Sequence, residues 1–291
     1  MPKEKKEVLL GLIALFVVVA VLGVAAYLVR RMPEQPALPN IPGLSATKPT
    51  QGGSTIPTQP TEPKPTLIPN PYDASDFVLS DGFMQLVDGG AMTGIDVSYH
   101  QKEINWRKVK DAGVQFVIVR LGYRGYETGS LVEDNMAMKN LQSAKDAGLL
   151  VGAYFYSQAI NAEEAAEEAR FALEILNGFQ LDLPIAYDWE YVSETARTAN
   201  VDGQTMTDCT IAFCDTILAG GYETMVYFNP QMAEHKLDMI ALQDKGYPFW
   251  LAHFSDVMTF PHQIWIWQYS YTGKIPGISG TVDFNIMLPI Y

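Results

Sequence analysis

A short apolar run, Leu183-Pro184-Ile185-Ala186-Tyr187-Asp188-Trp189-Glu190, ends in two carboxylates that are separated by one residue. Its length and its composition predict a β-strand. Residues i and i+2 of a strand project to the same face, so Asp188 and Glu190 would share one side while Trp189 points to the other. Neighbouring carboxyls raise one another's proton affinity, so that one can stay protonated while the other is ionised. Such a pair is typical of glycoside hydrolysis, although an ordinary strand whose polar end reaches solvent also fits these residues alone.

The start of the chain predicts a membrane anchor. Residues 8–29 carry no charge, and this length is enough to span a bilayer. The apolar core of a signal peptide is shorter, about 7 to 15 residues, so we expect an uncleaved transmembrane segment, although the sequence does not exclude cleavage. Lys3, Lys5 and Lys6 precede the span and Arg30-Arg31 follow it, which favours a cytoplasmic tail at 1–7 and an extracellular domain.

Residues 30–71 predict a disordered linker. Eleven of the chain's 18 prolines lie between Pro33 and Pro71, among Thr, Gln, Gly and Ser. A segment of this composition cannot bury enough apolar surface to offset its ordering entropy. It would hold the following domain away from the membrane.

The remaining residues, 72–291, are enough for one large domain, with a core that we expect at about 92–291 and with a segment, 72–90, that could form a strap across it. This part carries 13 Lys and Arg against 29 Asp and Glu, a net charge of −16. An acidic surface repels phosphate backbones, so nucleic acid is not an expected partner. Solubility is a sufficient explanation of the charge, and nothing in the sequence indicates an oligomeric state.

Short β-branched or aromatic runs alternate with amphipathic helical patterns through most of this domain. Eight strands are expected, at residues 93–98, 115–122, 150–157, 183–190, 224–229, 249–254, 263–269 and 281–286. Five helices are expected, at residues 106–112, 135–147, 162–176, 205–219 and 230–242. The alternation predicts an α/β fold, an irregular TIM-like (β/α) barrel of about eight strands and five helices, preceded by the transmembrane helix and the linker.

In such barrels the active site lies at the C-terminal ends of the strands, where the expected strands place four acids. These candidate catalytic residues are Asp96, Asp188, Glu190 and Asp283. Candidate substrate-binding residues stand at the same ends of other strands: Arg120, Tyr123, Tyr154 or Tyr156, Tyr227, Trp250 and Gln268. Aromatic rings and hydrogen-bonding groups around acids suit a sugar, which offers apolar ring faces and hydroxyl groups.

Several motifs occur together from about residue 94 to the C-terminus. They are Gly94-Ile95-Asp96-Val97-Ser98 with Gln101 and Trp106 after it, Val151-Gly152-Ala153-Tyr154-Phe155-Tyr156-Ser157, Asp188-x-Glu190, Trp267-Gln268-Tyr269 and Gly280-x-Val282-Asp283. In this order and spacing the chain resembles glycoside hydrolase family 25, the muramidase-type lysozymes. The resemblance implies an irregular α/β barrel and cleavage of the β-1,4 bond between N-acetylmuramic acid and N-acetylglucosamine in peptidoglycan.

The resemblance also implies roles for the four acids. Glu190 matches the general acid, and Asp188 matches the acid that stabilises the substrate or a developing positive charge. Asp96 and Asp283 match the other two carboxylates of the cleft. The sequence does not distinguish substrate assistance by the acetamido group from inversion by an activated water. His253 stands where many relatives carry Gln or another polar residue, which concerns the subsite contacts.

Other polar residues of the domain have simpler explanations. The four histidines show no metal-binding spacing, and neither a metal nor a cofactor is expected. Cys209 and Cys214 lie five residues apart in an expected helix, too far for a disulfide, so both should be free thiols. Four glutamates, Glu163, Glu164, Glu167 and Glu168, should form the solvated face of a helix whose Ala165, Ala169, Leu173 and Leu176 face the barrel.

These observations favour a membrane-anchored extracellular lysozyme whose partners are peptidoglycan glycan strands and, through the anchor, the membrane. The alternative is a catalytically inactive peptidoglycan-binding module on the same barrel. The presence of all four acids favours the enzyme, because a proton donor such as Glu190 has no purpose without a reaction. The preferred glycan modification and the physiological role do not follow from the sequence.

Overall fold

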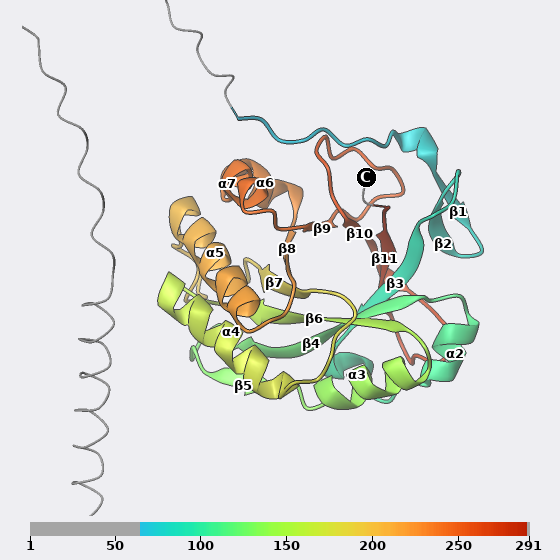
Figure 1. Cartoon of the computed structure of the whole chain (residues 1–291), viewed down its shortest axis with the longest axis horizontal. Helices are drawn as coiled ribbons and strands as arrows, with labels where there is room; N and C mark the ends of the chain where they lie inside the picture. The colour runs from blue at the N-terminus through green and yellow to red at the C-terminus, as the bar shows by residue number, and fades with distance from the viewer. Residues whose placement is uncertain (1–64, 290–291) are drawn as a thin grey trace, which may run out of the picture. The chain divides into compact units, whose positions relative to one another are not determined.

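The computed structural model describes residues 65–289, and these form an eight-stranded barrel with helices outside it (Figure 1). The barrel strands are β3 (Met92–Val97), β4 (Phe116–Arg124), β6 (Leu150–Ser157), β7 (Ile185–Trp189), β8 (Thr224–Phe228), β9 (Phe249–Ala252), β10 (Ile266–Gly273) and β11 (Val282–Met287). All eight expected strands are thereby confirmed. Seven run parallel, and β11 runs antiparallel to both of its neighbours, β10 and β3. The pairing of β3 with β4 closes the barrel.

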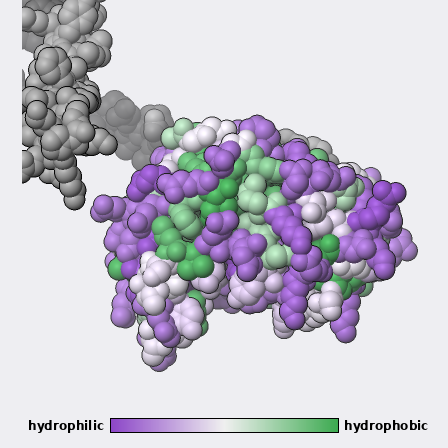
Figure 2. Space-filling model, turned by 90° about the horizontal axis from the view of Figure 1, so that it is seen from below, coloured by the Kyte–Doolittle hydropathy of each residue, from purple (hydrophilic) through white to green (hydrophobic). Residues whose placement is uncertain are grey.

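The expected anchor at 8–29 and most of the expected linker lie outside the described residues. Within residues 65–289, no helix combines the length and the apolar character that a bilayer crossing requires. On the face drawn in Figure 2, hydrophilic residues predominate around smaller apolar patches.

Six α-helices occur in the described part of the chain: α2 (Trp106–Asp111), α3 (Ala137–Asp146), α4 (Ala162–Leu176), α5 (Gly203–Ala219), α6 (Pro230–His235) and α7 (Met239–Asp244). The first four correspond to expected helices. The prediction of a single helix at 230–242 is wrong, because α6 ends at His235 and a separate helix, α7, begins at Met239. Asp238 causes the restart, since its side chain accepts a hydrogen bond from the Ala241 backbone N–H and caps α7.

The barrel interior is apolar at the N-terminal ends of the parallel strands. Phe116, Ile118, Met225 and Ile266 are buried there without measurable exposure. Gly94 makes room for the Phe116 ring, because a Cβ at position 94 would lie 2.1 Å from the Cζ atom of Phe116. These apolar side chains fill the N-terminal end of the barrel, and the polar residues lie above them at the C-terminal ends of the parallel strands.

A β-hairpin covers the side of the barrel where no helix connects the strands. It consists of β1 (Phe77–Ser80) and β2 (Phe83–Leu86), and Figure 1 shows it beside β11 and β3. The ring of Phe77 packs 5.3 Å from that of Trp267, and the ring of Phe83 packs 4.9 Å from that of Phe284. The segment before residue 92 therefore contributes buried side chains to the barrel domain.

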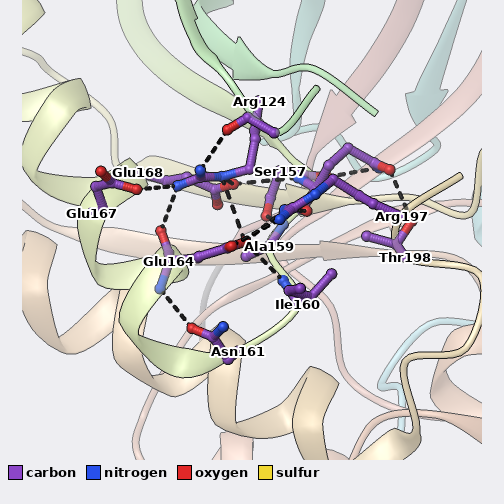
Figure 3. A network of polar contacts seen from close by, with 12 residues as sticks. Arg124, Ser157, Ala159, Ile160, Asn161, Glu164, Glu167, Glu168, Arg197 and Thr198 are labelled. Carbon is purple, nitrogen blue, oxygen red and sulfur yellow. Dashed lines mark hydrogen bonds and ion pairs between the residues drawn. The ribbon is translucent and has the colours of Figure 1, made fainter. Parts of the chain in front are cut away.

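The sequence predicts a solvated glutamate face on α4, and this prediction is wrong for Glu168. Glu168 is fully buried, and its Oε1 accepts a hydrogen bond of 2.8 Å from the Arg124 guanidinium (Figure 3). Glu164 is half-buried and pairs with Arg197. The other two glutamates of this face, Glu163 and Glu167, are exposed. The apolar residues expected to face the barrel do so: Ala165, Ala169, Leu173 and Leu176.

The two cysteines are free and buried in α5. Burial raises the pKa of the Cys209 and Cys214 thiols to about 12. Neither thiol is therefore reactive at neutral pH.

We expect Phe83→Ala to lower the free energy of unfolding by about 3–5 kcal/mol, because the ring is buried against Phe284. Leu79→Ala, on the same hairpin but 61% exposed, should change it by less than about 0.5 kcal/mol. Urea denaturation of a fragment that begins at residue 65 measures both. If Phe83→Ala lowers the free energy of unfolding as little as Leu79→Ala does, the hairpin does not contribute to the core.

Candidate active site

Four carboxyl side chains meet at the C-terminal ends of the parallel strands. Asp96 comes from β3, Asp188 from β7, Glu190 from the residue after β7, and Asp283 from β11. Because β11 is antiparallel, it begins where the other strands end, and Asp283 pairs in register with Asp96. All four line one cavity of about 220 Å³. The structure thus brings together the four acids that the sequence singled out.

The alternation expected at the end of β7 is present. Asp188 and Glu190 both line the cavity. Trp189 packs instead into the layer outside the barrel, where its Nε1–H donates to the Ala159 carbonyl at 3.1 Å. The strand geometry therefore directs both carboxyls to the same side.

Five of the six candidate substrate-binding residues line the same cavity: Arg120, Tyr156, Tyr227, Trp250 and Gln268. Tyr154 also lines it. Tyr123 does not, and its ring lies 5.3 Å from the Arg120 guanidinium, which also stacks 4.9 Å from the Tyr99 ring. Tyr123 therefore contacts Arg120 rather than the cavity.

Asp96 is held by two side-chain amides. Its Oδ2 accepts hydrogen bonds of 2.8 Å from Gln268 Nε2 and from Asn285 Nδ2. The amides are themselves oriented, because Tyr227 donates to Gln268 Oε1 and Trp250 donates to Asn285 Oδ1, both at 2.8 Å. These bonds partly offset the burial that raises the pKa of Asp96.

Asp188 lines the cavity and has a buried oxygen, Oδ1, without a hydrogen-bond partner among residues 65–289. Burial raises the pKa of Asp188 well above its ordinary value, and the nearby Glu190 and Asp96 raise it further. A bound molecule that donates a hydrogen bond to this oxygen would satisfy it.

Glu190 and Asp283 complete the acidic set. Burial raises the pKa of Glu190. Burial, followed by the charge of Asp96, raises the pKa of Asp283 to about 8. Four carboxyls in one poorly solvated cavity cannot all ionise at neutral pH, so the site holds both proton donors and carboxylates.

A second cavity, of about 640 Å³, continues from the first. The two share four lining residues: Glu190, Tyr227, Gln268 and Asp283. Its other walls come from the loop after β7, from α5 and α6, and from the end of β9, and they include Tyr191, Thr198, Val201, Met206, Met232 and Phe254. The two cavities thus adjoin, with Glu190 and Asp283 at the junction and Asp96 and Asp188 in the first cavity.

Two residues that support the site, Asn285 and Asp134, were not singled out from the sequence. Asn285 could have been found from its position two residues after Asp283, on the same face of β11. Asp134 gives no such signal, although its buried Oδ2 lies 2.9 Å from both Nε and Nη2 of Arg120 and fixes that guanidinium. It lies between the short strand β5 (Leu131–Glu133), which the sequence did not predict, and α3.

His253 lines neither cavity. It is half-buried, its ring stacks with Trp267 at 6.4 Å, and burial lowers its pKa. The difference at position 253 from relatives that carry another polar residue there therefore affects packing against Trp267 and not the lining of the cleft. Among residues 65–289, no group of three His, Cys, Asp or Glu side chains is placed to hold a metal ion.

Comparison with known proteins identifies the family. Residues 95–278 match the model of "Glycosyl hydrolases family 25". The chain belongs to this family. It is therefore a glycoside hydrolase, and the resemblance inferred from the motifs is confirmed.

Individual family 25 relatives agree with this assignment. Lysozyme M1 of Streptomyces globisporus is 28% identical over 214 residues, which cover 68% of each chain. The modular autolysin LytC from Streptococcus pneumoniae, solved in complex with a synthetic peptidoglycan ligand, is 28% identical with a TM-score of 0.62, over 73% of this chain and 52% of that one. This chain thus spans about half of that autolysin. The bacterial lysozyme from Streptomyces coelicolor is 26% identical with a TM-score of 0.52, over 67% of this chain and 90% of that one.

We expect Asp283→Asn to stabilise the family 25 domain at high pH but not at low pH. An exposed Asp has a pKa of about 3.9, and folding raises that of Asp283 to about 8. The stability associated with protonated Asp283 is therefore complete below about pH 4 and is lost as the pH rises through about 8. Asparagine is neutral at every pH and keeps an N–H donor towards Asp96, so it avoids this loss.

Denaturant unfolding at pH 4 and at pH 8.5 provides the measurement. Asp283→Asn should exceed the unsubstituted domain by more than about 1 kcal/mol at pH 8.5 and should match it at pH 4. Asp256→Asn removes the same charge at an exposed position and serves as the control. A similar change in stability at both pH values for Asp283→Asn would contradict the assigned burial of its charge.

Proposed function

We propose that this chain hydrolyses the β-1,4 bond between N-acetylmuramic acid and N-acetylglucosamine in bacterial peptidoglycan. The observation that carries the proposal is the meeting of Asp96, Asp188, Glu190 and Asp283 in the cleft of a family 25 domain. Two relatives with comparable identity support the choice of substrate, since one is named a lysozyme and the other was solved with a peptidoglycan ligand.

The shape of the cleft suits a polymer. The cavities of about 220 and 640 Å³ lie on either side of Glu190 and Asp283, which line both. A glycan strand in the cleft would place sugars in each cavity and the bond between them beside the acids. Aromatic rings such as Tyr156 and Trp250 offer apolar surfaces to the sugar rings.

Glu190 acts as the general acid. The burial that raises its pKa favours the protonated form, as proton donation to the leaving glycosidic oxygen requires. Attack by the substrate's own acetamido group and attack by a water molecule both need this proton. The role of Glu190 is therefore the same in a substrate-assisted and in an inverting reaction.

Asp188 stabilises the reacting sugar. Its Oδ1 is buried and unpaired within the described part of the chain, so an acetamido N–H of the substrate can donate to it. A hydrogen bond of this kind favours the carboxylate, whose charge then stabilises an oxocarbenium-like or oxazolinium-like centre. Arg120, fixed by Asp134, lines the same cavity.

Asp96 and Asp283 form a supporting pair. Asp96 accepts from two amides and a hydrogen bond joins it to Asp283. Since burial and the Asp96 charge raise the pKa of Asp283 to about 8, Asp283 can supply the proton of this hydrogen bond. The pair thereby fixes the edge of the cleft at which β3 and β11 meet.

We also propose that the domain acts outside the cell, attached to the membrane by residues 8–29. The charge-free span and the proline-rich segment after it support this location. An external wall substrate requires it.

We expect Glu190→Gln to lower the turnover of purified peptidoglycan by a factor of about 10² to 10⁴, because the substitution keeps the shape and removes the acidic proton. Asp188→Asn should also lose most of the activity. Borohydride reduction of the products followed by sugar analysis identifies the new reducing end. Reduced N-acetylmuramic acid is the expected product.

Two results would overturn this assignment. Reduced N-acetylglucosamine would mean that the other glycosidic bond is cleaved. An absence of soluble fragments from the unsubstituted domain, together with equal glycan binding by Glu190→Gln, would indicate a binding module without catalysis.

We expect protease treatment of intact cells to release the domain, because the proline-rich segment offers cleavable, accessible backbone between the membrane and the barrel. Immunoblotting of the supernatant against the domain detects the released fragment, and a cytoplasmic protein serves as the control for lysis. Protection of the domain until the cells are lysed would place it inside and remove the external substrate.

A further inference from the structure

The backbone of Glu190 lies just beyond the sheet. β7 ends at Trp189, whose register partner on β6 is Ser157, and Asp188 is the last β7 residue that pairs with β8. The ladder hydrogen bonds of the barrel therefore do not fix the residue that carries the proposed acid. The Glu190 backbone carbonyl instead accepts a hydrogen bond of 2.8 Å from Gln158 Nε2.

The Gln158 side chain is buried and fully paired. It has no exposed surface, and its Nε2 also donates to the Ser157 carbonyl at 2.8 Å. Its Oε1 accepts from the Thr198 hydroxyl at 2.8 Å. The carboxamide thus links the end of β6 to two points of the loop that follows β7, its first residue Glu190 and Thr198. Only a side chain with a donor and an acceptor at this distance from the backbone can make both contacts.

The Gln158 backbone is held as firmly as its side chain. Its N–H donates to Glu168 Oε1 at 3.3 Å, and its carbonyl accepts from Arg197 Nη1 at 2.6 Å. Arg197 is charged and paired with Glu164, which strengthens its hydrogen bond, and Glu168, whose pKa burial raises to about 7, is held by Arg124. The position of the carboxamide is therefore fixed from three elements: β6, α4 and the loop after β7.

A network of ion pairs surrounds these contacts (Figure 3). Arg124 lies 2.8 Å from Glu168 and 2.7 Å from Glu167, and Arg197 lies 2.6 Å from Glu164. None of these groups lines the cavity of the four acids. The network reaches the site through Gln158 and through the loop that carries Arg197.

We propose that Gln158 is a positioning residue for Glu190: its carboxamide holds the Glu190 backbone so that the carboxyl meets the scissile glycosidic oxygen. This inference rests on the proposed role of Glu190 as the acid. The net contribution of a hydrogen bond to stability is modest, because the unfolded chain makes hydrogen bonds to water instead. A displacement of about 1 Å at a reacting group, however, can lower a rate about 10²-fold. The main effect of Gln158 is therefore on turnover.

The first test is Gln158→Met, which keeps the length of the side chain and removes both polar groups. We expect kcat on peptidoglycan to fall about 10- to 100-fold, with KM changed less than about threefold. The matched control is Gln115→Met, which removes a side-chain hydrogen bond of 3.0 Å to the Thr93 backbone at the opposite end of the barrel. Glu167→Gln, at the exposed edge of the network, is the second control. Both controls should retain kcat within about threefold.

The second test separates positioning from a general loss of structure. In a Glu190→Gln background there is no acid to position, so adding Gln158→Met should lower the residual activity less than about threefold. If Gln158→Met costs the same factor in both backgrounds, its effect does not pass through Glu190 and the inference is wrong. If Glu190→Gln alone retains full activity, the proposed function fails instead, which keeps the two failures distinct.

A third variant covers the case in which Gln158→Met does not fold. Gln158→Glu has the same shape, keeps an acceptor for Thr198, and regains a donor for the Glu190 carbonyl only when it is protonated. Its activity relative to the unsubstituted domain should therefore rise as the pH falls, since both proteins keep the facing groups Glu164, Glu168 and Arg197. A ratio that stays constant from pH 8 to pH 5, or a full kcat for Gln158→Met, would overturn the inference.

Discussion

The site depends on the burial of carboxyl groups at one end of a closed barrel. Removing a carboxylate from water is unfavourable, and the fold offsets this cost unequally among the four acids. Asp96 receives two amide donors, the pKa of Asp283 is raised to about 8, and Asp188 retains an oxygen without a partner among the described residues. This inequality gives chemically similar groups different surroundings for a proton, which is what acid catalysis needs.

The antiparallel strand β11 makes this arrangement possible. A parallel eighth strand would present its C-terminal end at the cleft, whereas β11 presents its first residues, Asp283 and Asn285, beside Asp96. The reversal also removes the helix that a parallel connection would supply. The hairpin of β1 and β2 covers the outer surface left without that helix, through Phe77 and Phe83.

The sequence was most informative where local periodicity and strand order decide the outcome. All eight barrel strands followed from short apolar runs, and the convergence of the acids followed from their positions at strand ends. The break between α6 and α7 was missed because a helical apolar pattern continues through it, while the cap at Asp238 acts locally.

Interactions between distant residues could not be predicted in this way. Glu168 lies three residues after Ala165 and four before Ala172, on the buried face of α4, whereas Glu167 lies off that face. The pattern of α4 does not reveal the partner of Glu168, Arg124 at the end of β4. The same holds for Asp134, whose partner Arg120 lies on a neighbouring strand. Such pairs depend on tertiary contacts, and neither member alone identifies the other.

The ion pairs of Arg124 and Arg197 with the glutamates of α4 lie beside the loop that follows β7. A buried ion pair contributes little net stability, because desolvation of the charges offsets their attraction. Its geometric requirements are strict, however, and here they restrain the loop that begins with Glu190 and forms a wall of the second cavity. The proposed acid and part of the substrate-binding surface thus share one support outside the barrel. A network of this kind contributes more to the precision of the cleft than to the stability of the fold.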